Sequence, residues 1–445
     1  MTVTSDPAPA FDASGRPTAS LPKRELIRLS LYWLGISSIF AGLSAILQGR
    51  LVFDHLVADK DTAGRTLFGL TIGGAIIAMV LQPTIGSISD YTITRWGRRK
   101  PYIMIGAVLD LVFLIGIASS NSLVAIAAFV ALLQFSSNFA QGPFQGYVPD
   151  LVPAHQVGLA SALVGMMQIL GNVAGFLIGG IAVATNQFGL GLVALGVLEV
   201  ATMLSVVIRV REGSAAKPRN GRSWGAIAAE AWGTDILRER SFLWLVGSRL
   251  AVLMAGGALT NLAIFYLART LGMNQSESGT SFNIMVGLVA VGTVIAVVPA
   301  ARASDRIGRK KVIYASCAVG AVGLTTVAVA PSFTVALVGV VLYGLSAGIF
   351  LAVDWALMTD IIPKASSGRF MGLSNVATAS SGVLAIAFGG TLMDLVGGSD
   401  GPRAAMWLAV ALLGVGALLL TPVDERRRDE RLAQEGPLEA LPGPA

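Results

Sequence analysis

Four ionisable side chains stand inside long apolar runs of the chain: Asp110, Glu199, Arg249 and Asp354. A charge inside a lipid bilayer costs about 2.5–3.5 kcal/mol on insertion scales, so such residues are by default candidates for function. Loss of water favours the protonated form of a carboxyl group and a nearby arginine favours the ionised form, so an Asp–Arg pair can exchange a proton for a substrate. We expect Asp354 to face a central cavity with Arg249 as its partner. The alternative for this pair is a purely structural salt bridge.

The two remaining acids carry weaker expectations. Asp110 lies near the middle of its apolar run, and a coupling role and a structural role are equally open for it. Glu199 is expected to pack against a polar neighbour or to reach toward the membrane surface. The candidates for coupling are therefore Asp354, Arg249 and Asp110.

Four amide side chains follow one another at helical spacing: Gln134, Asn138, Gln141 and Gln145. Separations of four, three and four residues place them on one face of a helix. Paired donors and acceptors suit sugar hydroxyls, and a stripe this polar belongs in a water-lined cavity rather than against lipid. Hydrogen bonding between helices is the alternative. Weaker candidates for the same cavity share a polar or aromatic side chain within an apolar run: Gln48, Asn172, Asn261, Asn375 and Trp355.

The composition excludes several classes of protein. Of 445 residues, 54% are hydrophobic and only 13% are charged, whereas soluble domains carry about 25% charged residues. The chain is therefore not a soluble enzyme, a disordered chain or a nucleic-acid binder, despite its net charge of +6. One cysteine (Cys317) and two histidines supply neither a disulfide framework nor a metal site. We expect no metal, no cofactor and no enzymatic activity.

About 20 mainly apolar residues are needed for a helix to cross a bilayer, and twelve segments meet this requirement. They are Leu26–Gln48, Thr66–Ser87, Tyr102–Ala118, Leu123–Gln145, Gly158–Ala184, Gly189–Ile208, Phe242–Ala268, Ser281–Ala300, Val312–Ala330, Thr334–Met358, Met371–Leu395 and Ala404–Leu420. The prediction is an all-α membrane protein with twelve transmembrane helices.

Basic residues predict the orientation of these spans. They gather in alternate turns, most densely in 95–100, 209–240 and 302–311, and basic residues mark the cytoplasmic face. Both termini of a multi-pass protein of the cell membrane are therefore expected in the cytoplasm. The predicted parts are a tail (1–25), a six-helix bundle (26–209), a linker with an interfacial helix (210–240), a second six-helix bundle (241–421) and a tail (422–445).

Internal repetition indicates that the two bundles are pseudo-symmetric halves. Asp150, within a Val-Pro-Asp-Leu-Val-Pro run, recurs as Asp360 at an offset of 210 residues. Gly86–Lys100 recurs as Ala300–Lys311, each closing a span with Ser-Asp and then Gly-Arg and basic residues. Two repeated halves with a site between them at mid-membrane are the architecture of secondary transporters.

These turns resemble those of the major facilitator superfamily, and the resemblance extends from about Leu26 to Leu420. Its motif has Asp, a basic residue, a spacer and Gly-Arg, as in Asp305-Arg306-Ile307-Gly308-Arg309. The first copy has six residues between Asp90 and Gly97, and this longer form followed by Pro101 resembles the glycoside–pentoside–hexuronide and sucrose-transporter-like branch. The resemblance implies a gating charge network formed by Gly86, Asp90, Arg98, Arg99, Asp305 and Arg309.

A second match is similar to sucrose/proton symporters. Ser137-Asn138-Phe139-Ala140-Gln141-Gly142-Pro143 and Gly171-Asn172-Val173-Ala174-Gly175-Phe176 resemble helices 4 and 5 of that family. The resemblance implies uptake of a sugar or glycoside driven by a cation, usually H⁺. However, Gln134 stands where those symporters carry their proton-binding Asp, and 66–87 lacks the acids with which melibiose-type relatives hold Na⁺.

The sequence thus predicts a cation-coupled sugar or glycoside symporter that works by alternating access. The expected partners are a small-molecule substrate, H⁺ and the lipid bilayer, without nucleic acid, and the chain is expected to be a monomer. One alternative is an exporter of a drug or metabolite, which favours a more apolar cavity than the amide stripe. Another is a transport-inactive sensor or assembly protein, which should tolerate loss of Asp354 and of the amides.

Overall fold

The computed structural model describes residues 18–54, 56, 60–92, 94–210, 212, 240–361, 378 and 380–423. The regular structure in these ranges is entirely helical. Eleven of the described helices are long and apolar enough to cross a membrane, and Ser380–Val396 is a shorter apolar helix. The protein is therefore an all-α, multi-pass membrane protein.

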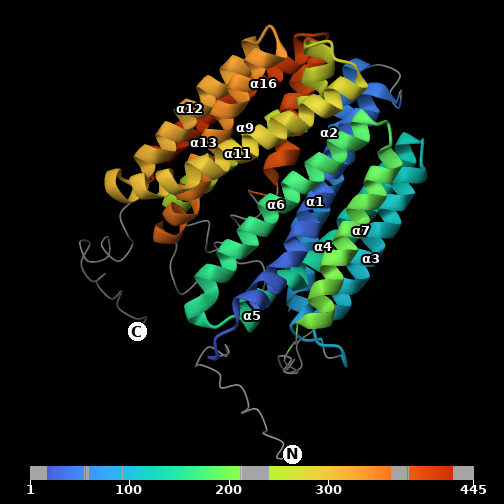
Figure 1. Cartoon of the computed structure of the whole chain (residues 1–445), viewed down its shortest axis with the longest axis vertical. Coiled ribbons are helices and arrows are strands. Elements are labelled where there is room, and N and C mark those ends of the chain that lie inside the picture. The colour runs from blue at the N-terminus through green and yellow to red at the C-terminus, as the bar shows by residue number, and fades with distance from the viewer. Residues whose placement is uncertain are drawn as a thin grey trace, which may run out of the picture. The chain divides into compact units, whose positions relative to one another are not determined.

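The chain divides into two units, of which the first contains the described part of Met1–Trp232 together with Met273–Asn283. Its long helices are α1 (Lys23–Phe53), α2 (Ala63–Ser89), α3 (Lys100–Ser119), α4 (Leu123–Gln145), α6 (Val157–Ala184) and α7 (Phe188–Arg209). The short helix α5 (Tyr147–Leu151) follows α4. Within this unit α1 packs against α6 and α7, α3 against α4 and α7, and α2 against α4 (Figure 1).

Small residues allow the helices of this unit to approach closely. A Cβ at Gly175 of α6 would lie 2.2 Å from the Ser38 carbonyl oxygen of α1. A Cβ at Gly142 of α4 would lie 2.5 Å from the Gln82 carbonyl oxygen of α2, and Gly86 faces Gly142 across the same crossing. Lipid supplies no hydrophobic drive between helices, so close backbone contact through small residues stabilises the bundle.

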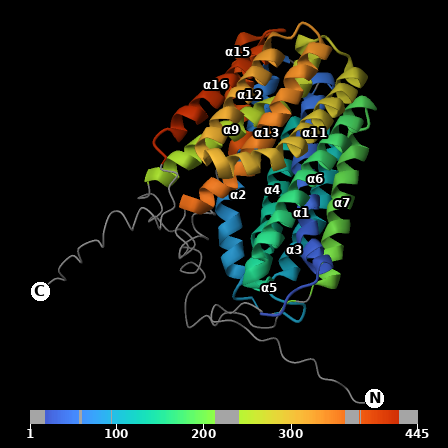
Figure 2. The same ribbon diagram turned by 60° about the vertical axis from the view of Figure 1, so that its left-hand side comes forward.

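The second unit contains the described part of Gly233–Gly272 and Ile284–Ala445. Its long helices are α9 (Arg240–Asn261), α11 (Gln275–Ile307, whose first residues belong to the first unit), α12 (Arg309–Val329), α13 (Phe333–Ile361) and α16 (Gly401–Leu420). Short elements are α10 (Ala263–Phe265), the π-helical turns Tyr266–Thr270 and Ile386–Gly390, and α15 (Thr391–Val396). α12 packs against α13 and α16, and α9 packs against α16 (Figure 2).

The helices of the structure can be compared with the predicted spans one by one. Ten predicted spans coincide with long helices. The predicted span Phe242–Ala268 follows α9 only to Asn261 and continues as α10 and the π-helical turn Tyr266–Thr270. The predicted span Met371–Leu395 is described from residue 380 onward, with Thr378 before it. α11 is 33 residues long against the 20 predicted, because the helix continues into polar residues at both ends. The interfacial helix predicted in 210–240 and most of both tails lie outside the described residues.

The repeated turns share an unusual backbone conformation. Gly97 has a φ of 117° and Gly308, which precedes α12, has a φ of 95°. L-residues with a side chain rarely adopt such angles, so glycine is required at both places. The two copies of the Gly-Arg motif therefore match in conformation as well as in sequence.

Candidate functional site

The predicted pair of Arg249 and Asp354 is present inside the second unit. Arg249 of α9 donates from Nη1 to Asp354 Oδ2 of α13, and the two residues are 4% and 2% exposed. Arg249 Nε also donates to Thr378 Oγ1 at 3.2 Å. Both charged groups are removed from water, where each ion is compensated mainly by the other.

Asp354 uses only one of its two carboxylate oxygens in this pair. Oδ1 is buried and has no hydrogen-bond partner among the described residues. A buried carboxylate oxygen without a donor is unfavourable, so this atom is a place where a proton or a substrate hydroxyl would be stabilised. Trp355 follows in α13, and its side chain lies outside the described part.

The four predicted amides lie along α4 in the first unit. Asn138 is 2% exposed, and Gln134, Gln141 and Gln145 are half-buried. Asn138 Nδ2 donates to the Gln134 carbonyl oxygen at 2.7 Å and to its Oε1 at 3.3 Å. The Gln134 side chain covers Gly74 of α2, where a Cβ would lie 2.3 Å from its Cγ. Part of the stripe therefore serves hydrogen bonding within α4 and packing against α2, and among the described residues these amides form no hydrogen bond from α4 to another helix.

The weaker polar candidates occupy different environments. Gln48 is fully buried in α1, with its amide 3.5 Å from Ser44 Oγ. Asn172 is exposed on α6. Asn261 ends α9 and donates back to the Gly257 carbonyl oxygen at 2.9 Å. Asn375 lies outside the described residues.

Asp110 forms no ion pair with a described Lys, Arg or His. It lies on α3, fully buried, against Ser136 of α4 and Glu199 of α7. Glu199 packs against a polar neighbour as expected, since the Tyr32 hydroxyl donates to its Oε1 at 2.9 Å.

A charge network joins α2, α3 and α5 at the first repeated turn. Arg99 Nη2 lies 2.7 Å from both Asp90 Oδ1 and Asp150 Oδ2, and Arg98 also pairs with Asp150. Arg99 Nη1 donates to the Pro143 carbonyl oxygen at 2.6 Å. The predicted residues Asp90, Arg98 and Arg99 are thus in one network, which also contains Asp150.

Glu212 completes this network and was not predicted. Its carboxylate accepts the backbone N–H groups of Arg99 and Lys100 at 2.9 Å each, so it occupies the N-terminus of α3. An anion at this position satisfies free N–H groups and complements the helix dipole. The Tyr147 hydroxyl also donates to Glu212. Burial, and then the Glu212 charge, raise the pKa of Tyr147, which keeps this donor protonated.

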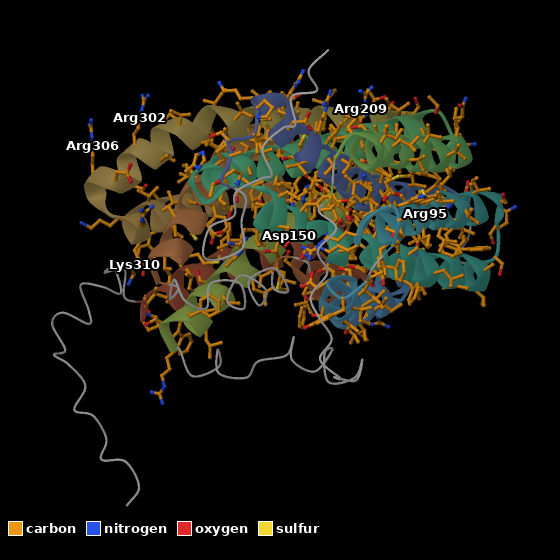
Figure 3. The ribbon with its side chains drawn as sticks, turned by 90° about the horizontal axis from the view of Figure 1, so that it is seen from below. Arg95, Asp150, Arg209, Arg302, Arg306 and Lys310 are labelled. Atoms are coloured by element: carbon orange, nitrogen blue, oxygen red, sulfur yellow. The ribbon has the colours of Figure 1, made fainter. Side chains whose placement is uncertain are left out.

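The second copy of the motif is more open. Asp305 is exposed near the end of α11, and Arg309 begins α12. Arg302 and Arg306 are exposed, and Figure 3 shows them projecting from the end of α11. Lys310 donates to the carbonyl oxygens of Thr421 and Val423 at 2.9 and 2.7 Å. The side chain of Asp360, the counterpart of Asp150, lies outside the described part.

The first unit thus contains the α4 amides, the Asp90 network and the group around Asp110 and Glu199, and the second unit contains the Arg249–Asp354 pair. Within the described residues no group of three or more His, Cys, Asp or Glu side chains could hold a metal ion.

Comparison with known proteins decides the family. A model of the Major Facilitator Superfamily matches residues 30–284 and 250–443. The chain belongs to this superfamily.

Among curated superfamily relatives, similarity to sucrose transport protein SUT1 of rice (Oryza sativa subsp. japonica) is 32% identity over 125 residues, 23% of each chain. Mouse membrane-associated transporter protein is 37% identical over 97 residues, 18% of each chain. Probable folate-biopterin transporter 7 of Arabidopsis thaliana is 27% identical over 258 residues, 54% of this chain and 57% of the relative. The chain therefore aligns with about a quarter of the length of the rice relative.

Solved structures share the superfamily fold over nearly the whole chain. A bacterial homologue of the human lysosomal transporter Spinster has a TM-score of 0.70 at 15% identity, with 91% of this chain and 98% of that chain covered. A D-xylose–proton symporter has a TM-score of 0.67 at 17% identity, with 89% and 98% covered. At these identities the likeness concerns the fold alone.

Proposed function

We propose that this member of the major facilitator superfamily is a secondary active transporter that couples entry of a sugar or glycoside to entry of H⁺ by alternating access. The buried Arg249–Asp354 pair carries the proposal. It places a carboxyl group inside the spanning helices with a counter-ion on one oxygen and no described partner on the other.

The Arg249–Asp354 pair can link binding of the proton to binding of the sugar or glycoside. When Asp354 is ionised, its charge holds the Arg249 guanidinium. When a proton binds Asp354, the ion pair weakens and guanidinium donors become available to substrate hydroxyls. Release of the substrate returns the arginine to the carboxylate and favours release of the proton.

The substrate class rests on the α4 amides and on relatives. Gln141 and Gln145 are half-buried and offer donors and acceptors for hydroxyls. The rice relative is named as a sucrose transport protein. Gln134, which replaces the helix-4 acid of sucrose symporters, cannot carry a proton, so coupling in this chain falls to Asp354.

The setting of the protein is also part of the proposal. Arg302 and Arg306 are exposed and basic, as expected of residues on a cytoplasmic face. We therefore assign both termini to the cytoplasm. The proposal further places the protein in the cell membrane as a monomer. The Asp90 network is assigned to stabilising one conformation of the cycle.

Uptake into proteoliposomes tests the function. The purified chain is exposed to labelled sucrose, an aryl glucoside, xylose, a nucleoside and folate, with and without an imposed proton gradient, and empty liposomes serve as the control. The proposal expects gradient-driven accumulation of at least one sugar or glycoside, reduced by Gln141→Leu. Accumulation of folate or the nucleoside alone would contradict the substrate class, and gradient-independent equilibration would contradict coupling.

A further inference from the structure

A second buried ionisable cluster lies in the first unit and has no part in the proposed coupling pair. It consists of Tyr32 of α1, Asp110 of α3, Ser136 of α4 and Glu199 of α7, all fully buried. α3 and α7 run side by side here (Figure 1). Asp110 is the eleventh of the 20 residues of α3, and Glu199 is the twelfth of the 22 of α7. At 1.5 Å per residue, both are about 15 Å from the ends of their helices.

Each carboxyl group uses one oxygen for a hydroxyl, and its other oxygen is buried without a partner among the described residues. Glu199 Oε1 accepts from Tyr32, and Asp110 Oδ1 lies in contact with Ser136 Oγ. The two carboxyl groups are within hydrogen-bonding reach of each other. If both were ionised, Asp110 Oδ2 and Glu199 Oε2 would both be buried without a donor in the described part of the chain. The buried Ser137 hydroxyl, next to Asp110, likewise has no hydrogen-bond partner there.

The neighbouring hydroxyl groups cannot supply enough hydrogen-bond donors if Asp110 and Glu199 are both ionised. Ser136 Oγ lies 3.1 and 3.2 Å from the Leu132 and Leu133 carbonyl oxygens as well as against Asp110. A serine carries one proton, so donation to its own helix leaves Asp110 Oδ1 facing a lone pair. One added proton between the carboxyl groups supplies the missing donor.

No positive charge among the described residues compensates the two acids. The titratable groups that face it from the packed helices are Tyr32 from α1 and the two acids themselves, while α4 contributes the hydroxyls of Ser136 and Ser137. Within the described ranges, neither acid forms an ion pair with Lys, Arg or His. Two unpaired negative charges within hydrogen-bonding reach in a membrane interior are strongly disfavoured.

The packing leaves little room for a larger cation. A Cβ at Gly35 of α1 would lie 2.8 Å from Glu199 Cα and 2.2 Å from Thr202 Oγ1. α1 therefore packs directly against the part of α7 that carries Glu199. Two adjacent carboxyl groups in this closely packed site fit a shared proton better than a metal ion surrounded by oxygen ligands.

We propose that Asp110 and Glu199 form a proton-binding site in which one proton is shared between the two carboxyl groups. The site is distinct from Arg249–Asp354 and does not depend on the proposed substrate. The bound proton holds α3 to α7, and Tyr32 extends the hydrogen-bonded chain to α1. Its release would leave two charges in the bundle and loosen these three helices.

Infrared spectroscopy of the purified full chain tests the assignment. Wild type is compared with Glu199→Gln, Asp110→Asn and the control Glu25→Gln, whose acid forms a partly exposed pair with Arg28. The proposal expects loss of one protonated-carboxyl C=O band in Glu199→Gln or Asp110→Asn and its retention in Glu25→Gln. Unchanged spectra in both test variants would overturn it. If one variant fails to fold, the other gives the same information, because an amide donates the bond that the proton supplied.

Thermal unfolding at several pH values provides an independent readout. Wild type is expected to lose stability on deprotonation as pH rises, while Glu199→Gln, which cannot acquire the second charge, shows a smaller loss than wild type. Equal alkaline losses in both would count against a shared proton. A sodium-dependent rise in wild-type melting temperature at fixed pH, absent in Glu199→Gln, would overturn the proposal and show that the site binds a sodium ion.

Discussion

This chain contains a carboxylate at a helix N-terminus and a carboxylate inside the membrane-spanning helices, and the two have different roles. Glu212 accepts two backbone N–H groups at the start of α3. Asp354 sits beside a buried guanidinium. The first position stabilises a local backbone structure, and we propose that the second changes its protonation during transport.

Glu212→Gln removes the charge that faces the N-terminus of α3. Hydrogen bonds to charged groups contribute about 1.5–3 kcal/mol, so we expect a loss of stability of this order. Thermal unfolding in detergent measures it, with Glu25→Gln as the matched control. An unchanged melting temperature would show that Glu212 does not stabilise α3.

Asp90→Asn weakens one of the two ion pairs of Arg99, while Asp150 still holds the guanidinium. We expect slower transport with nearly unchanged substrate affinity, because Asp90 lies in a turn rather than among the cavity candidates. Uptake rates and equilibrium binding separate the two effects, and Asp400→Asn, an exposed acid, is the control. A large loss of affinity with normal expression would contradict this division.

Some of these residues could be predicted and others could not. The Arg249–Asp354 pair follows from two opposite charges in apolar runs of the same half. The contact of Asp110 with Glu199 depends on the relative rotation of α3 and α7, which no single-helix pattern contains. Glu212 lies beyond a span, and its only signal is an acid among basic residues just after residue 209.

At the scale of elements, spans are predictable because bilayer thickness sets their length. The ends of the helices are harder to predict than the spans. α1 begins at Lys23 and α11 extends to Ile307, because helical hydrogen bonding continues beyond the apolar stretch. Gly175 and Gly165, ten residues apart on α6, show how context decides the role of a glycine. The first meets the backbone of α1, and the second has no neighbouring atom within 4 Å of an added Cβ.

Gly175→Ala should therefore destabilise the first unit, by about 1–3 kcal/mol as in overpacked interiors. Gly165→Ala should be neutral or slightly stabilising, because alanine favours helix. Thermal unfolding of the two variants compares the same chemical change on one helix. Equal melting temperatures would show that the α1–α6 crossing is not limited by Gly175.

At the scale of the molecule, the repeated motif and the positive-inside distribution together predict an orientation. A cysteine at exposed Arg306 should react with an impermeant maleimide only from the cytoplasmic side, and one at exposed Ser399 only from outside. The native Cys317 is buried, so it supplies little background. Labelling on the reversed sides would contradict the proposed orientation with cytoplasmic termini.

The most direct test of the account is transport by Asp354→Asn in proteoliposomes. The variant cannot bind and release a proton at residue 354, so we predict no accumulation in response to an imposed proton gradient. Substrate exchange down its own gradient should persist, which also shows that the variant is folded although Arg249 has lost its counter-ion. Accumulation by Asp354→Asn at the wild-type level would contradict the account and make the Arg249–Asp354 pair structural.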